Sequence, residues 1–136
     1  MSQNPVAPKT ILIIEDEAAI AQMYRLKLEM NGYKVEIALD GESGLKLISS
    51  VKPDLVLLDI MMPHMNGDEV LKKIRSNPNT ENLPVLILTN IGDESLRNRL
   101  EKLGVTSYIQ KSDLTPKHIL AKVNATLRNN NRGYHE

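Results

Sequence analysis

The sequence contains no cysteine, tryptophan or phenylalanine, and it has only four tyrosines. Without cysteine the chain can form neither disulfide bonds nor thiolate metal sites. It also lacks any apolar run of the roughly 18 residues that a membrane span requires. The first nine residues are polar, include Pro5 and Pro8, and do not resemble a secretory signal. We therefore expect a cytoplasmic protein that makes no contact with a membrane.

A net charge is lacking as well, because 17 lysine and arginine residues balance 17 aspartate and glutamate residues. The two signs are unevenly placed. Residues 1–96 hold nine basic and fourteen acidic residues, whereas residues 97–136 hold eight and three. This balance is too weak to predict direct nucleic acid binding. The basic excess near the end of the chain predicts a solvent-exposed basic face on the last helices. The more specific alternative is that this face is a docking surface for an acidic partner.

The chain does contain enough apolar material for a folded core. Of its 136 residues, 41% are hydrophobic and 25% are charged, which is typical of a folded globular protein. This length indicates a single domain. We assign the domain to residues 9–128, between a disordered N-terminal tail at 1–8 and a polar C-terminal tail at 129–136.

Three unbroken apolar runs predict strands that are buried on both faces. They cover residues 10–14, 55–58 and 84–88, and each leads directly into polar residues. Residues 34–39 alternate between apolar and polar side chains, as a half-exposed strand does. Residues 107–110 form a short fifth strand.

Helices are predicted between these strands from apolar residues at helical spacing. The apolar face of the first helix consists of Ala19, Met23, Leu26 and Met30. The apolar positions of the other helices are Leu45, Ile48 and Val51; Val70, Leu71 and Ile74; Leu96, Leu100 and Leu103; and Ile119, Val123 and Leu127. Asn31-Gly32 ends the first helix with a left-handed cap. The last helix is capped by Asp113 or Thr115 and has Pro116 in its first turn.

Five strands that alternate with five helices predict an α/β fold with a parallel sheet covered on both faces. The three fully apolar strands should be central, and the alternating second strand and the short fifth strand should be edges. The doubly wound, flavodoxin-like order 2-1-3-4-5 meets this condition. In that order the first and third strands are neighbours, so Glu15 and Asp16 should lie beside Asp59.

Three carboxylates at one edge of the sheet predict a metal site. Two unit charges about 4 Å apart repel by roughly 4 kcal/mol at an effective dielectric of 20. A hard divalent cation relieves this repulsion, and Mg²⁺ is commonly held by carboxylates, waters and phosphate oxygens. At the same edge Thr89 offers a hydroxyl and Lys111 an ammonium, which together suit a phosphoryl group. Asp59, at the centre, is the natural nucleophile for an aspartyl-phosphate.

A spaced set of residues carries a resemblance to a known family. It comprises Glu15-Asp16, the run D-I-M-M-P-x-M-N-G from Asp59 to Gly67, Thr89 thirty positions after Asp59, Lys111 fifty-two after it, and Tyr108 three before Lys111. Each element alone is weak, but the ordered set is specific. Over about residues 9–128 the chain resembles the receiver domain of two-component response regulators, in particular the stand-alone chemotaxis-type regulators.

This resemblance implies a phosphoryl-acceptor site. Asp59 would accept a phosphoryl group from the phosphohistidine of a sensor histidine kinase or a phosphotransfer protein. Asp16 would bind Mg²⁺ directly, Glu15 mainly through water, and Met61 through its backbone carbonyl, with Asp59 completing the metal ligands. The domain would be no enzyme beyond catalysing its own phosphorylation and dephosphorylation.

The resemblance also implies a switch. Thr89 and Lys111 would bind phosphoryl oxygens, and Thr89 together with Tyr108 would transmit phosphorylation to the surface. A downstream protein would bind the face formed by the fourth helix, fifth strand and fifth helix. The domain would act as a monomer or as a phosphorylation-dependent dimer.

Some positions depart from the commonest family pattern. Ser112 follows Lys111 where proline is usual, so the turn after the last strand is expected to differ. Asn90 follows Thr89 where a small residue is usual, and Met61 is bulky. Both should flank the phosphoryl site and slow the approach of water.

Other classes of protein fit the sequence less well. A phosphatase of the haloacid-dehalogenase type requires a second aspartate two positions after the first, where Met61 stands. A flavodoxin-type electron carrier requires a phosphate-binding loop after the first strand, where Glu15, Asp16 and Glu17 would repel a phosphate. A degenerate receiver that binds partners without phosphorylation is the remaining alternative. The presence of all five central residues of the site argues against it.

Overall fold

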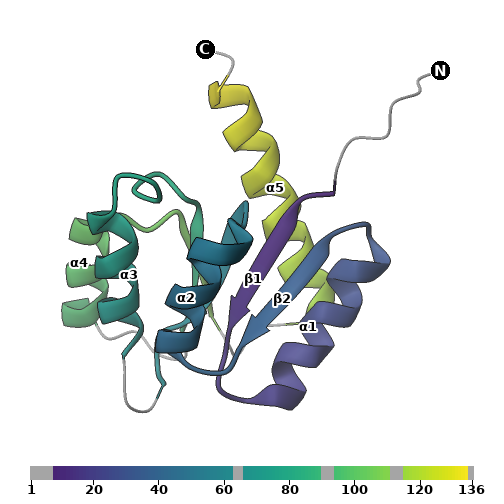
Figure 1. Ribbon diagram of the computed structural model, residues 1–136, viewed down its shortest axis with the longest axis horizontal. Helices are drawn as coiled ribbons and strands as arrows, with labels where there is room; N and C mark the ends of the chain where they lie inside the picture. Colours follow the sequence, from purple (N-terminus) through teal and green to yellow (C-terminus); the bar gives the residue numbers. More distant parts are fainter. Residues whose placement is uncertain (1–7, 63–65, 90–93, 111–114, 135–136) are drawn as a thin grey trace.

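The computed structural model describes residues 8–62, 66–89, 94–110 and 115–134, with side chains described as far as residue 128. The strands are β1 (Thr10–Ile14), β2 (Lys34–Ala38), β3 (Leu55–Asp59), β4 (Val85–Thr89) and β5 (Ser107–Gln110). The helices are α1 (Ala18–Met30), α2 (Gly41–Val51), α3 (Gly67–Ser76), α4 (Glu94–Leu103) and α5 (Pro116–Tyr134) (Figure 1). Strands and helices alternate along the chain, as the sequence predicts.

All five strands run parallel in one sheet of order β2-β1-β3-β4-β5. The predicted order and the two predicted edge strands are therefore confirmed. In this register Ile14 lies opposite Leu58, and Asp59 lies opposite Leu88. The residues that follow β1 consequently lie beside Asp59 at the carboxyl edge of the sheet, by which we mean the edge where all five strands end.

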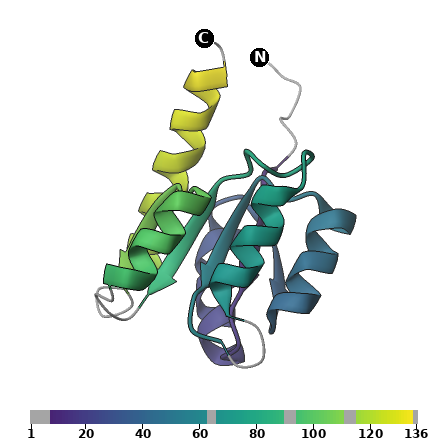
Figure 2. The same ribbon diagram turned by 90° about the vertical axis from the view of Figure 1, so that its left-hand side faces the viewer.

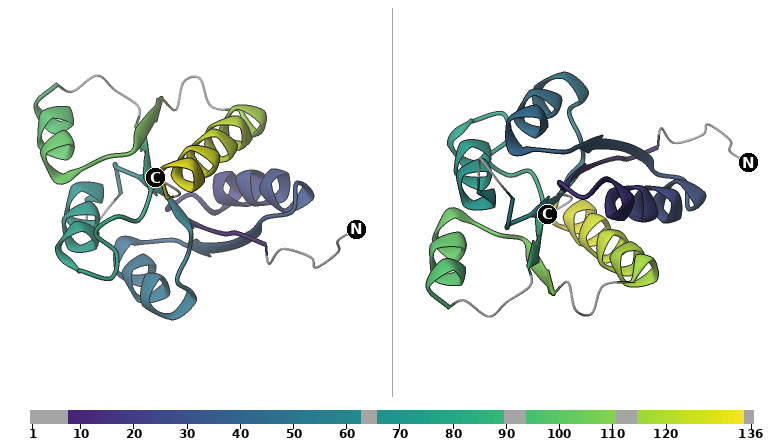
Figure 3. Two further views of the ribbon diagram at one scale, coloured as in Figure 1. Left: turned by 90° about the horizontal axis from the view of Figure 1, so that it is seen from above. Right: turned by 90° about the horizontal axis from the view of Figure 1, so that it is seen from below.

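Helices cover both faces of the sheet. Figure 3 shows α1 and α5 on one face and α2, α3 and α4 on the other. On the first face, buried residues of α1 and α5 pack with alternate strand residues such as Ile11, Leu57 and Leu86. On the second face, α2, α3 and α4 pack with the intervening strand residues such as Leu12 and Leu58. This two-sided packing explains why the central strands carry unbroken apolar runs.

The predicted apolar face of α1 is wrong. Met23, Leu26 and Met30 are 51%, 63% and 73% exposed, and Ala19 is exposed as well. The helix instead packs through its buried residues, which are Ala21, Tyr24 and Leu28. These residues also recur at helical spacing, so α1 carries two apolar faces and the spacing alone does not determine which one meets the sheet.

Two predicted boundaries also differ from the structure. The strand predicted over residues 34–39 ends at Ala38, and Leu39 is 48% exposed in the turn that leads to α2. α5 continues to Tyr134 through most of the segment predicted as a polar tail, and Figure 1 shows it extending beyond the sheet. No proline lies between Pro116 and Tyr134, so every residue of this stretch retains the backbone N–H that a helix requires.

Local capping accounts for several element ends. Asp40 accepts a hydrogen bond from the Ser43 amide at 2.7 Å and begins α2. Gly32 has a φ of +94° after α1, as the predicted left-handed cap requires. The Thr115 hydroxyl oxygen accepts a hydrogen bond from the His118 amide at 3.1 Å, which confirms Thr115 as a cap of α5, while Asp113 lies outside the described residues.

No helix in the described part of the chain is long and apolar enough to cross a membrane.

Gly67 allows α3 to begin directly against the end of β3. A Cβ atom at this position would lie 2.6 Å from the Ile60 Cα and 2.9 Å from the Asp59 carbonyl oxygen. Both are backbone atoms, so the backbone itself would have to move. We expect Gly67→Ala to lower the free energy of unfolding by about 1–3 kcal/mol, the usual effect of overpacking.

Urea unfolding checks this expectation, with Gly32→Asn as the control. Gly32 has positive φ, which asparagine tolerates better than most residues, and no atom lies within 4 Å of its Cβ position. Equal stability of Gly67→Ala and the control would contradict the steric argument.

Candidate functional site

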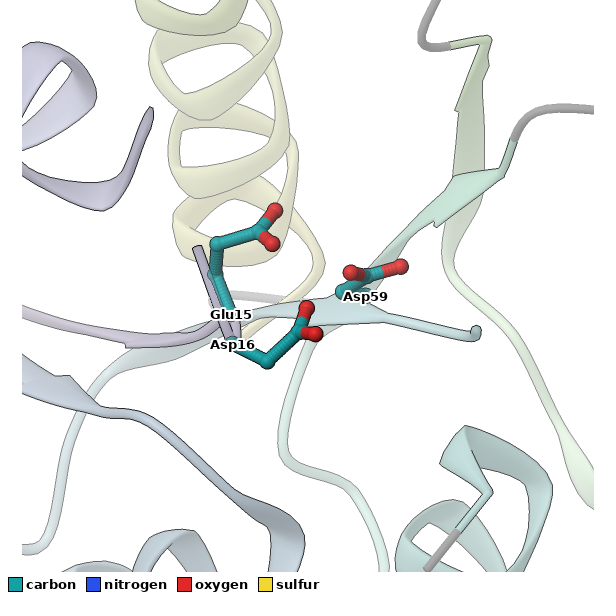
Figure 4. Close-up of side chains that lie close together, drawn as sticks. All are labelled: Glu15, Asp16 and Asp59. Atoms are coloured by element: carbon teal, nitrogen blue, oxygen red, sulfur yellow. The ribbon is translucent and has the colours of Figure 1, made fainter. Parts of the chain in front are cut away.

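An acidic cluster lies at the carboxyl edge of the sheet. Glu15 and Asp16 follow β1, and Asp59 is the last residue of β3. One carboxylate oxygen from each of these residues lies within 4.8 Å of the other two (Figure 4). In Figure 4 the carboxylates of Glu15 and Asp16 extend toward Asp59. The prediction that these three residues lie together is confirmed.

Two of the three carboxylates are buried. Glu15 is 0% and Asp59 1% exposed, whereas Asp16 retains contact with solvent. The backbone holds both buried groups: the Met61 amide donates to Asp59 Oδ1 at 3.0 Å, and the Glu17 amide donates to Glu15 Oε2 at 3.1 Å. Such backbone bonds orient the carboxylates. Three negative groups are thereby fixed close together at a partly water-excluded edge.

The chemistry of this donor set fits a hard divalent cation. All the side-chain ligands are carboxylate oxygens, which Mg²⁺, Ca²⁺ and Mn²⁺ prefer over nitrogen or sulfur. A cation in the cluster would also offset the repulsion between the carboxylates. The residues present therefore fit the metal ion that the sequence predicts, without specifying which ion it is.

Thr89 reaches the same edge from β4. Leu88 lies opposite Asp59, and the Ile60 amide donates to the Leu88 carbonyl oxygen at 3.1 Å. Thr89 is the next residue along β4, where it is only partly buried. Its backbone position thus places a hydroxyl-bearing residue beside the acidic cluster. Lys111, Asn90 and Ser112 lie outside the described residues.

Tyr108 lies in β5 and packs against α4. It is half-buried and pairs in register with Ile87. The Arg97 guanidinium carbon lies 4.5 Å from the centre of the Tyr108 ring, within the range of a cation–π contact. The Tyr108 hydroxyl also donates to the Arg97 carbonyl oxygen at 3.4 Å. Tyr108 is therefore attached to α4, a contact that sequence reasoning missed because it depends on how α4 packs beside β5.

The environment of the Tyr108 hydroxyl favours its neutral form. Burial is the main cause of a raised pKa, and the nearby Glu101 carboxylate raises the pKa further. The positive charge of Arg97 opposes these effects. The tyrosine consequently stays protonated and able to donate a hydrogen bond at neutral pH.

The described residues also form hollows outside the acidic cluster. One is lined by residues that include Lys52, Asn77 and Thr80, and a second by residues that include Lys72 and Lys73. Neither contains a group of converging carboxylates like that at the carboxyl edge. We place the functional site at the carboxyl edge, where open α/β folds bind their ligands.

The doubly wound parallel sheet and its acidic cluster define an α/β domain with a candidate cation site at the carboxyl edge of the sheet. The response regulator receiver domain family matches residues 11–124, and the chain belongs to this family. The fold and the cluster at Glu15, Asp16 and Asp59 agree with this membership.

Individual proteins resemble the chain along most of its length. Response regulator MprA of Mycolicibacterium vanbaalenii is 39% identical over 123 residues, which are 89% of this chain and 51% of that protein. A CheY-like response regulator receiver domain protein from Methanospirillum hungatei has a TM-score of 0.86 at 29% identity, covering 93% of this chain and 98% of that one. The Mn²⁺-bound form of response regulator Rcp1 has a TM-score of 0.71 at 28% identity, covering 81% and 86%. The chain spans about half the length of the curated relatives it matches.

Membership of this family gives the chain its general role. It is a receiver domain of two-component signal transduction, which is a phospho-accepting signalling domain and not a classical enzyme. The family implies a histidine kinase as partner. The acidic pocket of Glu15, Asp16 and Asp59 is typical of metal-binding receivers.

Proposed function

We propose that Asp59 accepts a phosphoryl group from the phosphohistidine of a sensor kinase or phosphotransfer protein. The observation that carries this proposal is the position of its buried carboxylate, which ends a central strand beside Glu15 and Asp16. An oxygen of the Asp59 carboxylate forms the new bond to phosphorus as the phosphorus–nitrogen bond breaks. The electron pair of the broken bond stays on the imidazole nitrogen, so the reaction needs no further reactant.

The test of this proposal is mass spectrometry after treatment with acetyl phosphate and Mg²⁺. One aspartyl-phosphate adds about 80 Da, one HPO₃ unit. Absence of this mass gain would favour the alternative of a degenerate receiver that binds its partners without phosphorylation.

We assign the metal ion to Mg²⁺, held by Asp16 directly, by Glu15 mainly through water, by Asp59, and by the Met61 backbone carbonyl. When bound, Mg²⁺ neutralises carboxylate and phosphoryl oxygens. Asp16 suits direct binding because it retains contact with solvent, whereas one oxygen of Glu15 already accepts the Glu17 amide. The similar protein Rcp1 has been solved with Mn²⁺ bound, which supports a divalent ion here.

The phosphoryl oxygens would be bound by the Thr89 hydroxyl and the Lys111 ammonium. For Thr89 the position at the end of β4 supports this role. For Lys111 the support is its place in the sequence. Met61 is 57% exposed next to Asp59, and we expect it, together with Asn90, to slow hydrolysis of the phosphoryl group.

Phosphorylation would be transmitted through Thr89 and Tyr108. A phosphoryl group adds a charge of about −1.5 to −2 and three acceptor oxygens, so the Thr89 hydroxyl should turn toward it. The turn vacates space on the side of β5, into which Tyr108 moves from its half-buried position against Arg97. This movement changes the α4–β5–α5 surface, which we propose as the binding site of a downstream protein. The mechanism is a shift between two populated states.

We also propose that the receiver domain comprises residues 9–128 and acts in the cytoplasm. Its basic excess near the end of the chain would suit an acidic surface on the downstream protein. It would act there as a monomer or as a phosphorylation-dependent dimer.

Thr89→Ala should permit phosphorylation of Asp59 but uncouple it from the α4–β5–α5 surface. Alanine leaves the acidic cluster intact and removes the hydroxyl that turns toward the phosphoryl group. NMR of backbone amides and of Tyr108, with and without beryllofluoride as a phosphoryl mimic, measures the coupling. Ser49→Ala is the matched control, because it removes an exposed hydroxyl on α2. If Thr89→Ala and the control show the same shifts at Tyr108 and along α4, the proposed route is wrong.

A further inference from the structure

The C-terminal end of α4 is defined by Gly104. This glycine has a φ of +100°, and its amide donates to the carbonyl oxygens of Leu100 and Glu101 at 3.1 and 3.2 Å. It closes the helix in the left-handed conformation that glycine adopts most readily. The carbonyl oxygen of Gly104 then faces a side chain from another helix.

That side chain is Arg75, in the last turn of α3. Its Nε donates to the Gly104 carbonyl oxygen at 2.8 Å. Its Nη1 donates to the Leu83 carbonyl oxygen at 2.7 Å and, at longer range, to those of Glu81 and Thr80 at 3.2 and 3.3 Å. One guanidinium group therefore joins the end of α4 to the loop between α3 and β4.

Only the planar fork of arginine can make this connection. Nε and Nη1 donate in fixed directions to two chain segments at once, which a lysine ammonium on a flexible stem does not reproduce. Within the described ranges no ion pair involves Arg75, so backbone carbonyl oxygens solvate its charge. Burial lowers the pKa of Arg75 from its usual value, which agrees with a guanidinium held largely by protein rather than by water.

The rest of α4 is attached to α3 less firmly. Among its described residues only Leu100 is fully buried. The second polar contact to α3 joins Arg99 and Asp68 at 3.8 Å, and the Arg99 side chain is largely exposed, so this ion pair contributes little. Figure 2 shows α3 and α4 side by side, both running from the carboxyl edge toward the amino edge. The attachment of α4 to α3 is therefore strongest at the C-terminal end of α4, which is far from the acidic cluster. Nearer its start, α4 contacts Tyr108 of β5 through Arg97.

We propose that Arg75 is a positioning residue that fixes the C-terminal end of α4, so that α4 pivots about Gly104 when Asp59 is phosphorylated. The pivot rests on the proposed function, because it assumes that phosphorylation of Asp59 moves α4. Displacement should be largest at the first turn of α4, near Glu94 and Arg97, and smallest at Gly104. The movement then occurs mainly in the part of α4 that contacts Tyr108 through Arg97.

The test compares the wild type with Arg75→Met, which removes every donor, and Arg75→Lys, which retains the charge. Lys73→Met is the matched control, because Lys73 is an exposed cation on the same helix. Arg99→Met removes only the exposed ion pair. Hydrogen exchange of the Gly104 amide measures how firmly Arg75 holds the end of α4 in the unphosphorylated protein. Amide shifts along α4 on addition of beryllofluoride measure the pivot.

We expect exchange at Gly104 to be roughly tenfold faster or more in both Arg75 variants, because losing one charge-assisted hydrogen bond changes an equilibrium by at least that factor. Lys73→Met and Arg99→Met should match the wild type. On addition of beryllofluoride, shifts in the wild type should concentrate in the first turn of α4. In the Arg75 variants they should extend to Gly104, although Asp59 is still phosphorylated at the wild-type rate.

Unchanged exchange at Gly104 in both Arg75 variants would show that Arg75 does not fix the C-terminal end of α4. Faster exchange with an unchanged distribution of beryllofluoride shifts would overturn the pivot and leave Arg75 with a purely structural role. A wild type in which Asp59 is phosphorylated but α4 does not respond would also overturn the pivot. A failure of the proposed function itself differs from these results, because the wild type would then gain no phosphoryl group.

Discussion

Asp59→Asn should abolish phosphorylation of the chain. Asparagine has the shape of aspartate and keeps an oxygen that can accept the Met61 amide, which Asp59 Oδ1 accepts at 3.0 Å. It lacks the anionic oxygen that attacks phosphorus, so no aspartyl-phosphate can form. The substitution also removes one of three converging negative charges, so the fold should tolerate it. The expected result is a folded protein that gains no mass.

Intact-mass spectrometry after treatment with acetyl phosphate and Mg²⁺ measures this result. The wild type should gain about 80 Da and Asp59→Asn should gain nothing. Asp68→Asn is the matched control, since Asp68 is an acidic residue in the first turn of α3 and outside the cluster. It should be labelled like the wild type. Undiminished labelling of Asp59→Asn would place the acceptor on another residue.

The position of the acidic cluster could be predicted from sequence because it depends on only two properties of the chain. The apolar runs that end before Glu15 and at Asp59 identify central strands, and parallel strands bring their carboxyl ends to one edge. The observed register, in which Ile14 lies opposite Leu58, then brings the carboxylates together. Neither step requires knowledge of side-chain packing.

Properties that depend on packing could not be predicted in the same way. The face of α1 that meets the sheet contains Tyr24, while the other face contains Met23 and Leu26. Both faces have apolar residues at helical spacing, and the exposed face carries three large apolar side chains. Choosing between them requires the shape of the space between α1, the sheet and α5, which is a tertiary property.

Contacts between segments that are distant in the chain also could not be predicted from the sequence. Arg75 reads as an ordinary cation in the last turn of a helix, where it complements the helix dipole. Its four bonds to carbonyl oxygens arise because the loop after α3 and the turn after α4 come together around it. The cation–π contact between Arg97 and Tyr108 depends in the same way on the placement of α4 beside β5.

Asp16→Asn should weaken Mg²⁺ binding without unfolding the protein. The substitution keeps an oxygen ligand but removes one negative charge from a cluster whose carboxylate oxygens lie within 4.8 Å of one another. Even in the dielectric of bulk water, two unit charges 4 Å apart interact by about 1 kcal/mol, and a divalent ion therefore loses about 2 kcal/mol. The expected decrease in affinity is roughly thirtyfold or more, since 1.4 kcal/mol corresponds to a factor of ten.

The same charge has the opposite effect when no cation is bound. Asp16 then repels Glu15 and Asp59, so Asp16→Asn should raise the free energy of unfolding in a metal-free buffer. A bound ion stabilises the folded state by an amount that grows with the logarithm of its concentration divided by its dissociation constant. Added Mg²⁺ should therefore raise the melting temperature of the wild type more than that of the variant. Glu17→Gln is the matched control, because Glu17 is an exposed neighbouring acid outside the cluster. Calorimetric titration with Mg²⁺ gives the affinities directly.

Equal affinities in the wild type and Asp16→Asn would rule out Asp16 as a main ligand. If the variant is less stable than the wild type in metal-free buffer, the proposed repulsion between Asp16 and the carboxylates of Glu15 and Asp59 is contradicted.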